Sequence, residues 1–247
     1  MSSESAGEGP HSCPALSQSD SGLSSVELEL LRELVLADSP PRLPVPGEWL
    51  GGREGRRFEV LRELGHGAMG WVFRARDEEL QREVALKFLM PRGTFIEEAL
   101  REARAIARLS HEHIVRIFDV GEWSDRPGAT RLPFLVMECL EGESLAAVLH
   151  REGRLEPGRA LEILDAILAG LAHAHEHRVI HRDLKPSNVF ITREGTAKLL
   201  DFGLAWFTVS ALPRAPHQPT AGTPGYMAPE QWRGEAQDVR TDLWAAG

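Results

Sequence analysis

The chain has 247 residues, enough for one large domain or two small ones with a sizeable core. Its 42% apolar and 26% charged residues are typical of a soluble globular protein. Residues 1–50 hold eight acidic residues and two arginines, a net −6 of the total −9. Because neither part of the chain has a basic stripe, a nucleic-acid partner is not expected.

The cysteines and the apolar runs bear on where the chain works. Cys13 and Cys139 are the only cysteines and have no metal-ligand spacing, which favours a reducing interior over a disulfide framework. No apolar run reaches the ~18–20 residues of a membrane span. The N-terminus lacks the basic and apolar regions of a signal peptide. We therefore expect a cytoplasmic chain without a membrane segment, and an anchor in a longer version stays open.

Residues 1–56 are expected to form a disordered, acidic tail. Ten of the first 40 residues are serine, and four prolines follow between residues 40 and 46. Such a composition buries little apolar surface. Within it, residues 24–37 repeat apolar side chains at helical spacing, which indicates either a transient helix or a short docking helix.

From Arg57 the sequence changes to short β-rich runs. The runs that predict strands are 58–64, 70–77, 83–90, 113–123 and 133–139. Between the third and fourth runs we expect a helix that is capped by Thr94, with Glu97 completing a capping box. The residues that would form its apolar face are Ile96, Ala99, Leu100, Ala103, Ile106 and Leu109.

Beyond Gly142 the sequence predicts mainly helices. A leucine stripe marks a long amphipathic helix that ends near His177. The residues of this stripe are Leu161, Leu164, Leu168 and Leu171. The predicted order is therefore a β-rich small lobe, a short connector and a helical large lobe.

Gly65, Gly67 and Gly70 form a G-x-G-x-x-G pattern that is followed by Val72. Glycines let a backbone turn tightly and approach phosphate oxygens. Dinucleotide-binding folds use the same spacing, but there a helix begins at the third glycine. Here Gly70 leads into a strand-like run, so we expect a hairpin tip. Taken alone, the pattern also fits a purely structural turn.

Lys87 lies on a predicted strand, 22 positions after Gly65. A lysine that holds nucleotide phosphates needs a carboxylate to fix its ammonium group. Glu102 is the candidate, because it lies at the edge of the helix's apolar face, where a charge needs a partner. Glu98, one turn earlier, remains an alternative.

Two further segments complete the pattern. Residues 181–188 read His-Arg-Asp-Leu-Lys-Pro-Ser-Asn, and an Asp-Phe-Gly segment begins at Asp201, 18 residues after Asp183. Together with the glycine loop and the segment around Lys87, they closely resemble the eukaryotic-type (Hanks-type) Ser/Thr protein kinases, with the bacterial branch as the best match. The resemblance covers about residues 57–247.

This resemblance implies an α+β, bilobal protein-kinase-like fold. The β-rich N-lobe would span residues 57–138 and contain one key helix, and the hinge would be residues 138–142. A mainly helical and incomplete C-lobe would span residues 143–247. The implied reaction is transfer of the γ-phosphate of ATP to protein Ser/Thr hydroxyls, with autophosphorylation in signalling. Protein substrates are the expected partners, and a kinase dimer stays open.

The resemblance also implies a role for each motif residue. Asp183 would accept or orient the proton of the substrate hydroxyl, and Lys185 would neutralise the γ-phosphate. Lys87 would hold the α- and β-phosphates, steadied by Glu102. The residues that would hold Mg²⁺, with Mn²⁺ as an alternative, are Asn188 and Asp201.

The nucleotide pocket is carried over in the same way. The residues that would line it are Leu64, Gly65, Gly67, Gly70, Val72, Ala85, Lys87, Met137, Glu138, Leu140 and Phe190. Met137 would be the gatekeeper, and the Glu138 carbonyl and Leu140 amide would bind adenine. Phe190 would form the floor, where the family usually has a smaller aliphatic residue.

The activation segment would run from Asp201 to Glu230. Thr223 matches the threonine that packs against the catalytic aspartate in Ser/Thr kinases. Thr220 is the candidate for regulatory autophosphorylation, with Thr208 and Ser210 behind it.

His173, His175, His177 and His181 form a dense group. One interpretation is a metal site, because His173 and His177 are one helical turn apart. The other is a helix end, where polar or cationic side chains suit exposed carbonyls.

The chain ends within what would be the opening of the central helix of the large lobe, where Asp242 would brace the catalytic loop. Compared with the family, further helices are missing, as is the arginine that would pair with Glu230, which leaves Glu230 unpaired. We therefore expect a C-terminally truncated kinase domain. The alternative is a catalytically weak, kinase-like module that binds ATP or regulates another protein.

Overall fold

The computed structural model describes residues 42–51, 56–67, 70–89, 96–126, 131–202 and 224–247. All of them belong to one compact unit, residues 40–247. The helix expected at residues 24–37 and the cap at Thr94 lie outside the described residues. The side chains at positions 96–99 and 102 are also not described.

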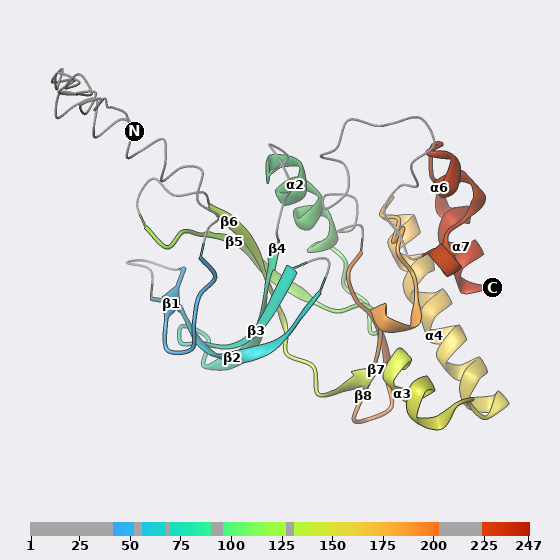
Figure 1. Ribbon diagram of the computed structural model, residues 1–247, viewed down its shortest axis with the longest axis horizontal. Helices are drawn as coiled ribbons and strands as arrows, with labels where there is room; N and C mark the ends of the chain where they lie inside the picture. The colour runs from blue at the N-terminus through green and yellow to red at the C-terminus, as the bar shows by residue number, and fades with distance from the viewer. Residues whose placement is uncertain (1–41, 52–55, 68–69, 90–95, 127–130, 203–223) are drawn as a thin grey trace, which may run out of the picture. The chain divides into compact units, whose positions relative to one another are not determined.

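A curled, antiparallel six-stranded sheet forms one side of this unit (Figure 1). Its strand order is β1-β2-β3-β4-β6-β5. The strands are β1 (Trp49–Leu50), β2 (Phe58–Gly67), β3 (Gly70–Asp77), β4 (Arg82–Leu89), β5 (Ile117–Trp123) and β6 (Leu132–Glu138). The five strands expected from the sequence are therefore confirmed, and phenylalanines such as Phe88 and Phe134 fill the core on one face of the sheet.

Strand β1 lies inside the stretch that was expected to be a disordered tail. Leu50 pairs with Phe58 of β2 and is buried in the same core as Phe88. The Gly47 N–H also donates to the carbonyl of Val60 at 2.8 Å. The proline-rich composition did not indicate that Leu50 would be buried. Because this residue pairs with β2 and is buried, a short edge strand precedes the expected boundary at residue 57.

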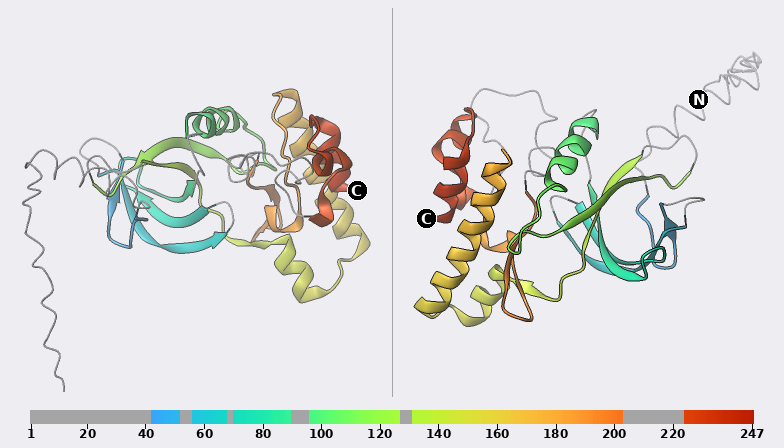
Figure 2. Two further views of the ribbon diagram at one scale, coloured as in Figure 1. Left: turned by 45° about the horizontal axis from the view of Figure 1, so that its top comes forward. Right: turned by 180° about the vertical axis from the view of Figure 1, so that it is seen from behind.

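Helix α2 (Ile96–Ile106) packs between the sheet and the helical part of the unit (Figures 1 and 2). Its described apolar face is confirmed, because Leu100, Ala103 and Ile106 are buried. Leu109 follows the helix and is also buried. The single core cluster that contains Ala103 and Ile106 continues into the helical part, so the two parts share apolar packing.

The helical part contains α3 (Leu145–Glu152), α4 (Pro157–Glu176), α6 (Pro229–Arg233) and α7 (Val239–Ala246). A small sheet of β7 (Gly142–Ser144), β8 (Val189–Thr192) and β9 (Ala197–Leu199) lies beside them. Helix α7 packs against α4 (Figure 1). Among the residues that the structure describes, no helix is both long and apolar enough to cross a membrane.

Helix α4 exists as expected, but its buried face is rotated relative to the predicted leucine stripe, of which only Leu171 is buried. Leu161 and Leu168 of the predicted stripe are 66% and 38% exposed. The buried residues are Ile163, Ala166, Ile167, Gly170, Leu171 and Ala174. This set of residues faces the core because Gly170 lets the helix approach β9 closely. A Cβ on Gly170 would lie only 2.9 Å from Leu199 Cδ1 and 3.0 Å from the His113 carbonyl oxygen.

Candidate active site

A cavity of about 620 Å³ lies where the first sheet meets β8 and the segment that follows α4. The predicted pocket residues that line it are Leu64, Gly65, Gly70, Val72, Ala85, Lys87, Met137, Glu138, Leu140 and Phe190. Lys185, Asn188 and Asp201 lie on its wall as well. The surroundings of Gly67 fall outside the described part of the chain.

The cavity wall also contains residues that were not predicted to line it: His66, Val115, Ser144, Ser187 and Leu200. Leu200 directly precedes Asp201, so its proximity follows from the chain itself. Val115 comes from the start of a run that was expected to be all strand. Instead β5 begins at Ile117, because the Val115 N–H bonds to the Leu199 carbonyl of β9 at 2.9 Å.

The glycine loop is a hairpin tip, as predicted, because Gly67 of β2 pairs with Gly70 of β3. Gly70 has a φ of +130°, and a Cβ there would lie 1.9 Å from the Phe88 carbonyl oxygen. Glycine at this position is therefore required by strand packing. Gly65 differs, because an added Cβ meets no atom within 4 Å and its φ is ordinary.

This contrast gives a matched pair of variants. Gly70→Ala is expected to lower the free energy of unfolding by about 1–3 kcal/mol, because the residue is forced into a disfavoured conformation against Phe88. Gly65→Ala should change stability by less than about 1 kcal/mol. Urea unfolding of both variants checks this. Equal losses in the two variants would contradict the explanation.

The segment after α4 holds three polar side chains together. The Asp183 carboxylate accepts a bond from Lys185 Nζ at 2.7 Å and from Asn188 Nδ2 at 3.1 Å. Asn188 Nδ2 also donates to the Asp183 carbonyl at 2.8 Å. Pro186–Asn188 forms a 3₁₀ turn, which places Asn188 back against Asp183. Asp183 is only 4% exposed, so water competes little with these bonds, and they fix the position of its carboxylate.

Lys87 is buried and reaches the Asp-Phe-Gly segment that begins at Asp201. Its Nζ lies 2.5 Å from Asp201 Oδ1. Asp201 has a φ of +61°, an uncommon conformation for a residue other than glycine. Glu102, the expected partner of Lys87, is on α2, but its side chain is not described. The described contact therefore joins Lys87 to a candidate metal ligand.

Asp242 of α7 binds the backbone just before Asp183, as expected. Its carboxylate accepts the His181 and Arg182 N–H groups, each at 2.8 Å. His175 Nε2 lies 2.7 Å from the same carboxylate. Arg182 has a φ of +66°, so the loop is held in a strained conformation while Asp242 receives both N–H groups.

His181 is fully buried and takes a single tautomer. Its Nε2 donates to the Leu200 carbonyl at 2.8 Å, and its Nδ1 faces the Asp183 N–H at 3.4 Å. The ring packs against Phe202. Burial lowers the pKa of His181 below its ordinary value of 6.5, and the nearby carboxylates oppose this only in part.

Stability should therefore fall as the pH decreases below about 6.5. In the unfolded chain His181 takes up a proton there, whereas the folded chain keeps it neutral, so the unfolded state binds more protons. The loss is up to about 1.4 kcal/mol per pH unit for each such group. Burial and its histidine neighbours also lower the pKa of His111, which contributes with the same sign.

Urea unfolding between pH 7.5 and 5.5 measures this dependence. His181→Gln should be less stable at pH 7.5 but should lose stability less steeply in acid. Parallel pH dependences for the parent and the variant would contradict the assignment of a buried, neutral His181.

The histidine group lies at the end of α4. The rings of His173 and His177 are tilted relative to each other with centroids 4.5 Å apart, and His111 stacks on His173 at 5.1 Å. Within the described ranges, no three or more His, Cys, Asp or Glu side chains are grouped so that they could hold a metal ion. The structure therefore gives no support to the metal-site interpretation for these residues.

Most of the activation segment, with Thr208, Ser210, Thr220 and Thr223, lies outside the described residues. Its far end is described. The expectation that Glu230 is unpaired is wrong, because Thr241 Oγ1 donates to its carboxylate at 2.6 Å. The sequence did not predict Thr241 of α7 as the partner, because no local pattern indicates that α7 packs against α6.

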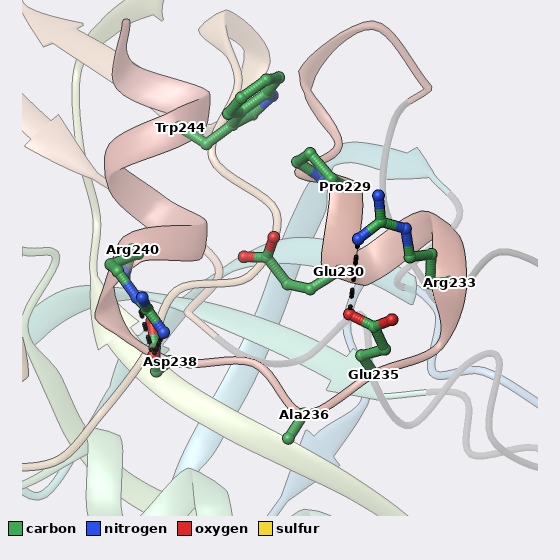
Figure 3. A pocket seen from close by; sticks show the side chains of 8 residues that line it. All are labelled: Pro229, Glu230, Arg233, Glu235, Ala236, Asp238, Arg240 and Trp244. Atoms are coloured by element: carbon green, nitrogen blue, oxygen red, sulfur yellow. Dashed lines mark hydrogen bonds and ion pairs between the residues drawn. The ribbon is translucent and has the colours of Figure 1, made fainter.

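A second cavity of about 360 Å³ lies beside this bond, between α6 and α7 (Figure 3). Glu230 points into the space between the two helices, and Trp244 lies above it. Arg233 faces Glu235 at 3.9 Å, and Arg240 pairs with Asp238 at 2.7 Å. The two arginines that line the cavity are thus each joined to a neighbouring acidic residue.

Comparisons with known proteins agree with this geometry. The sequence profile described as "Protein kinase domain" matches residues 58–247. A probable serine/threonine-protein kinase of Streptomyces coelicolor is 38% identical over 79% of this chain. PrkC of Bacillus subtilis is 36% identical over 80% of this chain, and pkn3 of Myxococcus xanthus is 39% identical over 83%. Both are named serine/threonine-protein kinases.

The matches cover only part of these relatives, namely 29%, 30% and 39% of their respective lengths. Among solved structures, the PknI kinase domain of Mycobacterium tuberculosis is similar with a TM-score of 0.65 and 27% identity. That similarity covers 83% of this chain and 74% of the PknI chain. The expected bilobal α+β fold is confirmed.

Proposed function

Since this chain belongs to the protein kinase domain family, we propose that it is a serine/threonine kinase, which transfers the γ-phosphate of ATP to hydroxyl groups of proteins. One observation carries the proposal: two lysines, a carboxylate and an amide line one cavity beside a glycine hairpin, namely Lys87, Lys185, Asp201 and Asn188. A second carboxylate, that of Asp183, accepts bonds from Lys185 and Asn188. Phosphoryl transfer asks a protein mainly for positioning and for neutralisation of charge, and this set can provide both.

The cavity suits ATP in size and polarity. Its volume of about 620 Å³ lies within the usual range for small-molecule sites. Val72, Ala85, Met137 and Phe190 give apolar walls for a purine ring, and the lysines give positive charge for phosphates. The Glu138 carbonyl and the Leu140 amide are the groups that we expect to bind the adenine edge.

Asn188 and Asp201 are suited to hold Mg²⁺, because both offer oxygen ligands. The side-chain nitrogen of Asn188 is engaged by Asp183, so the amide is oriented and its oxygen is the atom that would bind the cation. A bound Mg²⁺ would neutralise the charge of the phosphates, and Mn²⁺ could take the same ligands.

The remaining residues would act on the substrates directly. Asp183, held by Lys185 and Asn188, would orient the attacking hydroxyl and accept its proton. Lys185 would stabilise the γ-phosphate. Lys87 would hold the α- and β-phosphates, with Glu102 as its proposed carboxylate partner. We also propose that residues 57–138 act as the small lobe, 138–142 as the hinge and 143–247 as part of the large lobe.

Transfer of ³²P from Mg-ATP to the purified chain and to a generic basic protein tests the proposal. Lys87→Met should lower the rate by about 100-fold, because it removes the cation that holds the phosphates. Arg131→Met is the matched control, since Arg131 is exposed and distant from the cavity lining. We expect the labelled chain to carry phosphate on Thr220, located by mass spectrometry.

Two outcomes would count against parts of this proposal. A folded parent that transfers no phosphate would contradict the kinase activity and favour a module that only binds ATP or regulates another protein. Active protein in which Thr220 stays unmodified would contradict the proposed regulatory site alone.

A further inference from the structure

Lys198 of β9 is a charged residue for which the proposed mechanism has no role. Its Nζ lies 2.8 Å from Glu138 Oε1, at the end of β6 and the start of the hinge. The side chains of Lys198 and Glu138 are 16% and 25% exposed, so both are partly shielded from water. Among the residues that the structure describes, Glu138 alone lines both the nucleotide cavity and a smaller cavity of about 320 Å³ that Lys198 lines.

Glu138 is held by its backbone as well as by its carboxylate. The Arg116 N–H donates to Glu138 Oε1 at 2.8 Å. In return, the Glu138 N–H donates to the Arg116 carbonyl at 3.0 Å. One carboxylate oxygen therefore receives both a lysine ammonium and a backbone amide, which fixes its position more firmly than a single exposed ion pair would.

The segment that includes Arg116 is bound to β9 on its other side. The Leu199 N–H donates to the His113 carbonyl at 2.8 Å, and the Val115 N–H donates to the Leu199 carbonyl at 2.9 Å. His113 Nδ1 also bonds to the Ala197 carbonyl at 2.9 Å. Residues 113–116 thus connect the end of β6 with β9, and the pair of Glu138 and Lys198 joins the same two strands directly.

Lys198 is one of very few lysines in the chain. The chain has 25 arginines and only three lysines, Lys87, Lys185 and Lys198. The first two line the nucleotide cavity. The third joins the hinge to β9, the strand that ends two residues before Asp201.

We propose that Glu138 and Lys198, hereafter the hinge pair, are positioning residues that hold the hinge against β9 and thereby set the affinity for the nucleotide. This inference rests on the proposed function, because the Glu138 carbonyl is there expected to bind adenine. The carboxylate and the carbonyl belong to one residue, so the bond to Lys198 limits how that carbonyl can move. The described side-chain bonds of Asp183 and Asn188 join these residues to each other and to Lys185, so we expect the chemical step to be spared.

Removal of the ammonium should therefore change nucleotide binding and leave turnover alone. We expect Lys198→Met to raise the Kd for a fluorescent ATP analogue, and the KM for ATP, about twofold to fivefold. The value of kcat should stay within about twofold of the parent. Lys198→Arg, which keeps the charge, should restore most of the affinity.

Glu138→Gln and the double variant isolate the pair. Gln has nearly the same shape, so this variant removes the charge with little risk to folding. If the two residues act through each other, the Kd of the variant that carries both Glu138→Gln and Lys198→Met should not exceed the higher of the two single-variant Kd values. The inference would be overturned by additive losses of nucleotide affinity in the double variant, or by a Kd for Lys198→Met equal to that of the parent. Nucleotide binding by the parent would still support the proposed function.

Lysine acetylation tests the pair without any need for catalysis. Because the chain has three lysines, peptide mass spectrometry can follow each one after brief treatment with an activated acetyl ester. Lys198 should react at least about twice as fast in Glu138→Gln as in the parent, with Lys185 as the internal reference. An unchanged rate at Lys198 would overturn the pair even if the chain proved to have no kinase activity.

Discussion

Asp183→Asn is expected to lower kcat for phosphoryl transfer by about 10²- to 10⁴-fold, which is the range for loss of a general base. The carboxylate of Asp183 is fixed by Lys185 and Asn188, two residues that line the proposed nucleotide cavity. Asparagine keeps the shape but removes the charge and most of the basicity. The rate of ³²P transfer at saturating Mg-ATP measures the effect.

The fold should survive this change, because the bonds to Lys185 and Asn188 can still be accepted by an amide oxygen. Asp165→Asn is the matched control, since it makes the same chemical change on an exposed part of α4. Urea unfolding should give both variants nearly the stability of the parent. Asp183→Asn with more than a tenth of the parent's kcat would show that this carboxylate is not the base.

Part of the site could be predicted from local sequence, whereas the nucleotide pocket was expected only from the family resemblance. Asp183, Lys185 and Asn188 lie within six residues, so one turn of chain brings them together. The glycine hairpin follows from strand signals on both of its sides. Such predictions succeed because the geometry is set by neighbours in the chain rather than by packing of distant segments.

Contacts between distant segments could not be predicted in the same way. Thr241 as the partner of Glu230 and Lys198 as the partner of Glu138 depend on how whole elements pack. The buried face of α4 is a related case. Two apolar stripes of the helix compete, and a glycine that permits close approach to β9 decides between them.

The proline-rich start of the chain shows the limit of composition as a guide. Composition averages over many residues, whereas burial of Leu50 depends on one side chain and one pairing with β2. Composition also cannot predict the positive φ of Arg182, because arginine does not favour this conformation and its presence gives no sign of it.

Asp242→Ala should have the largest effect on stability, lowering the free energy of unfolding by about 3–5 kcal/mol. Asp242 is 1% exposed, and its carboxylate receives N–H groups of His181 and Arg182 as well as the ring of His175. Alanine leaves two backbone N–H groups without their acceptor, and the strained φ of Arg182 loses its support. The loss is a large part of the ~5–15 kcal/mol of a typical domain.

Asp238→Ala is the control, because Asp238 caps the same helix from an exposed position. Its carboxylate accepts the Arg240 N–H at 2.8 Å, and loss of such a cap costs about 0.5–2 kcal/mol. Urea unfolding of the two variants separates loss of the cap from loss of the buried acceptor. Asp242→Asn should fall between them, since its amide oxygen can still accept while its nitrogen cannot. If Asp242→Ala cost no more than Asp238→Ala, α7 would not be the element that holds the loop before Asp183 in place, and transfer activity should then persist in that variant.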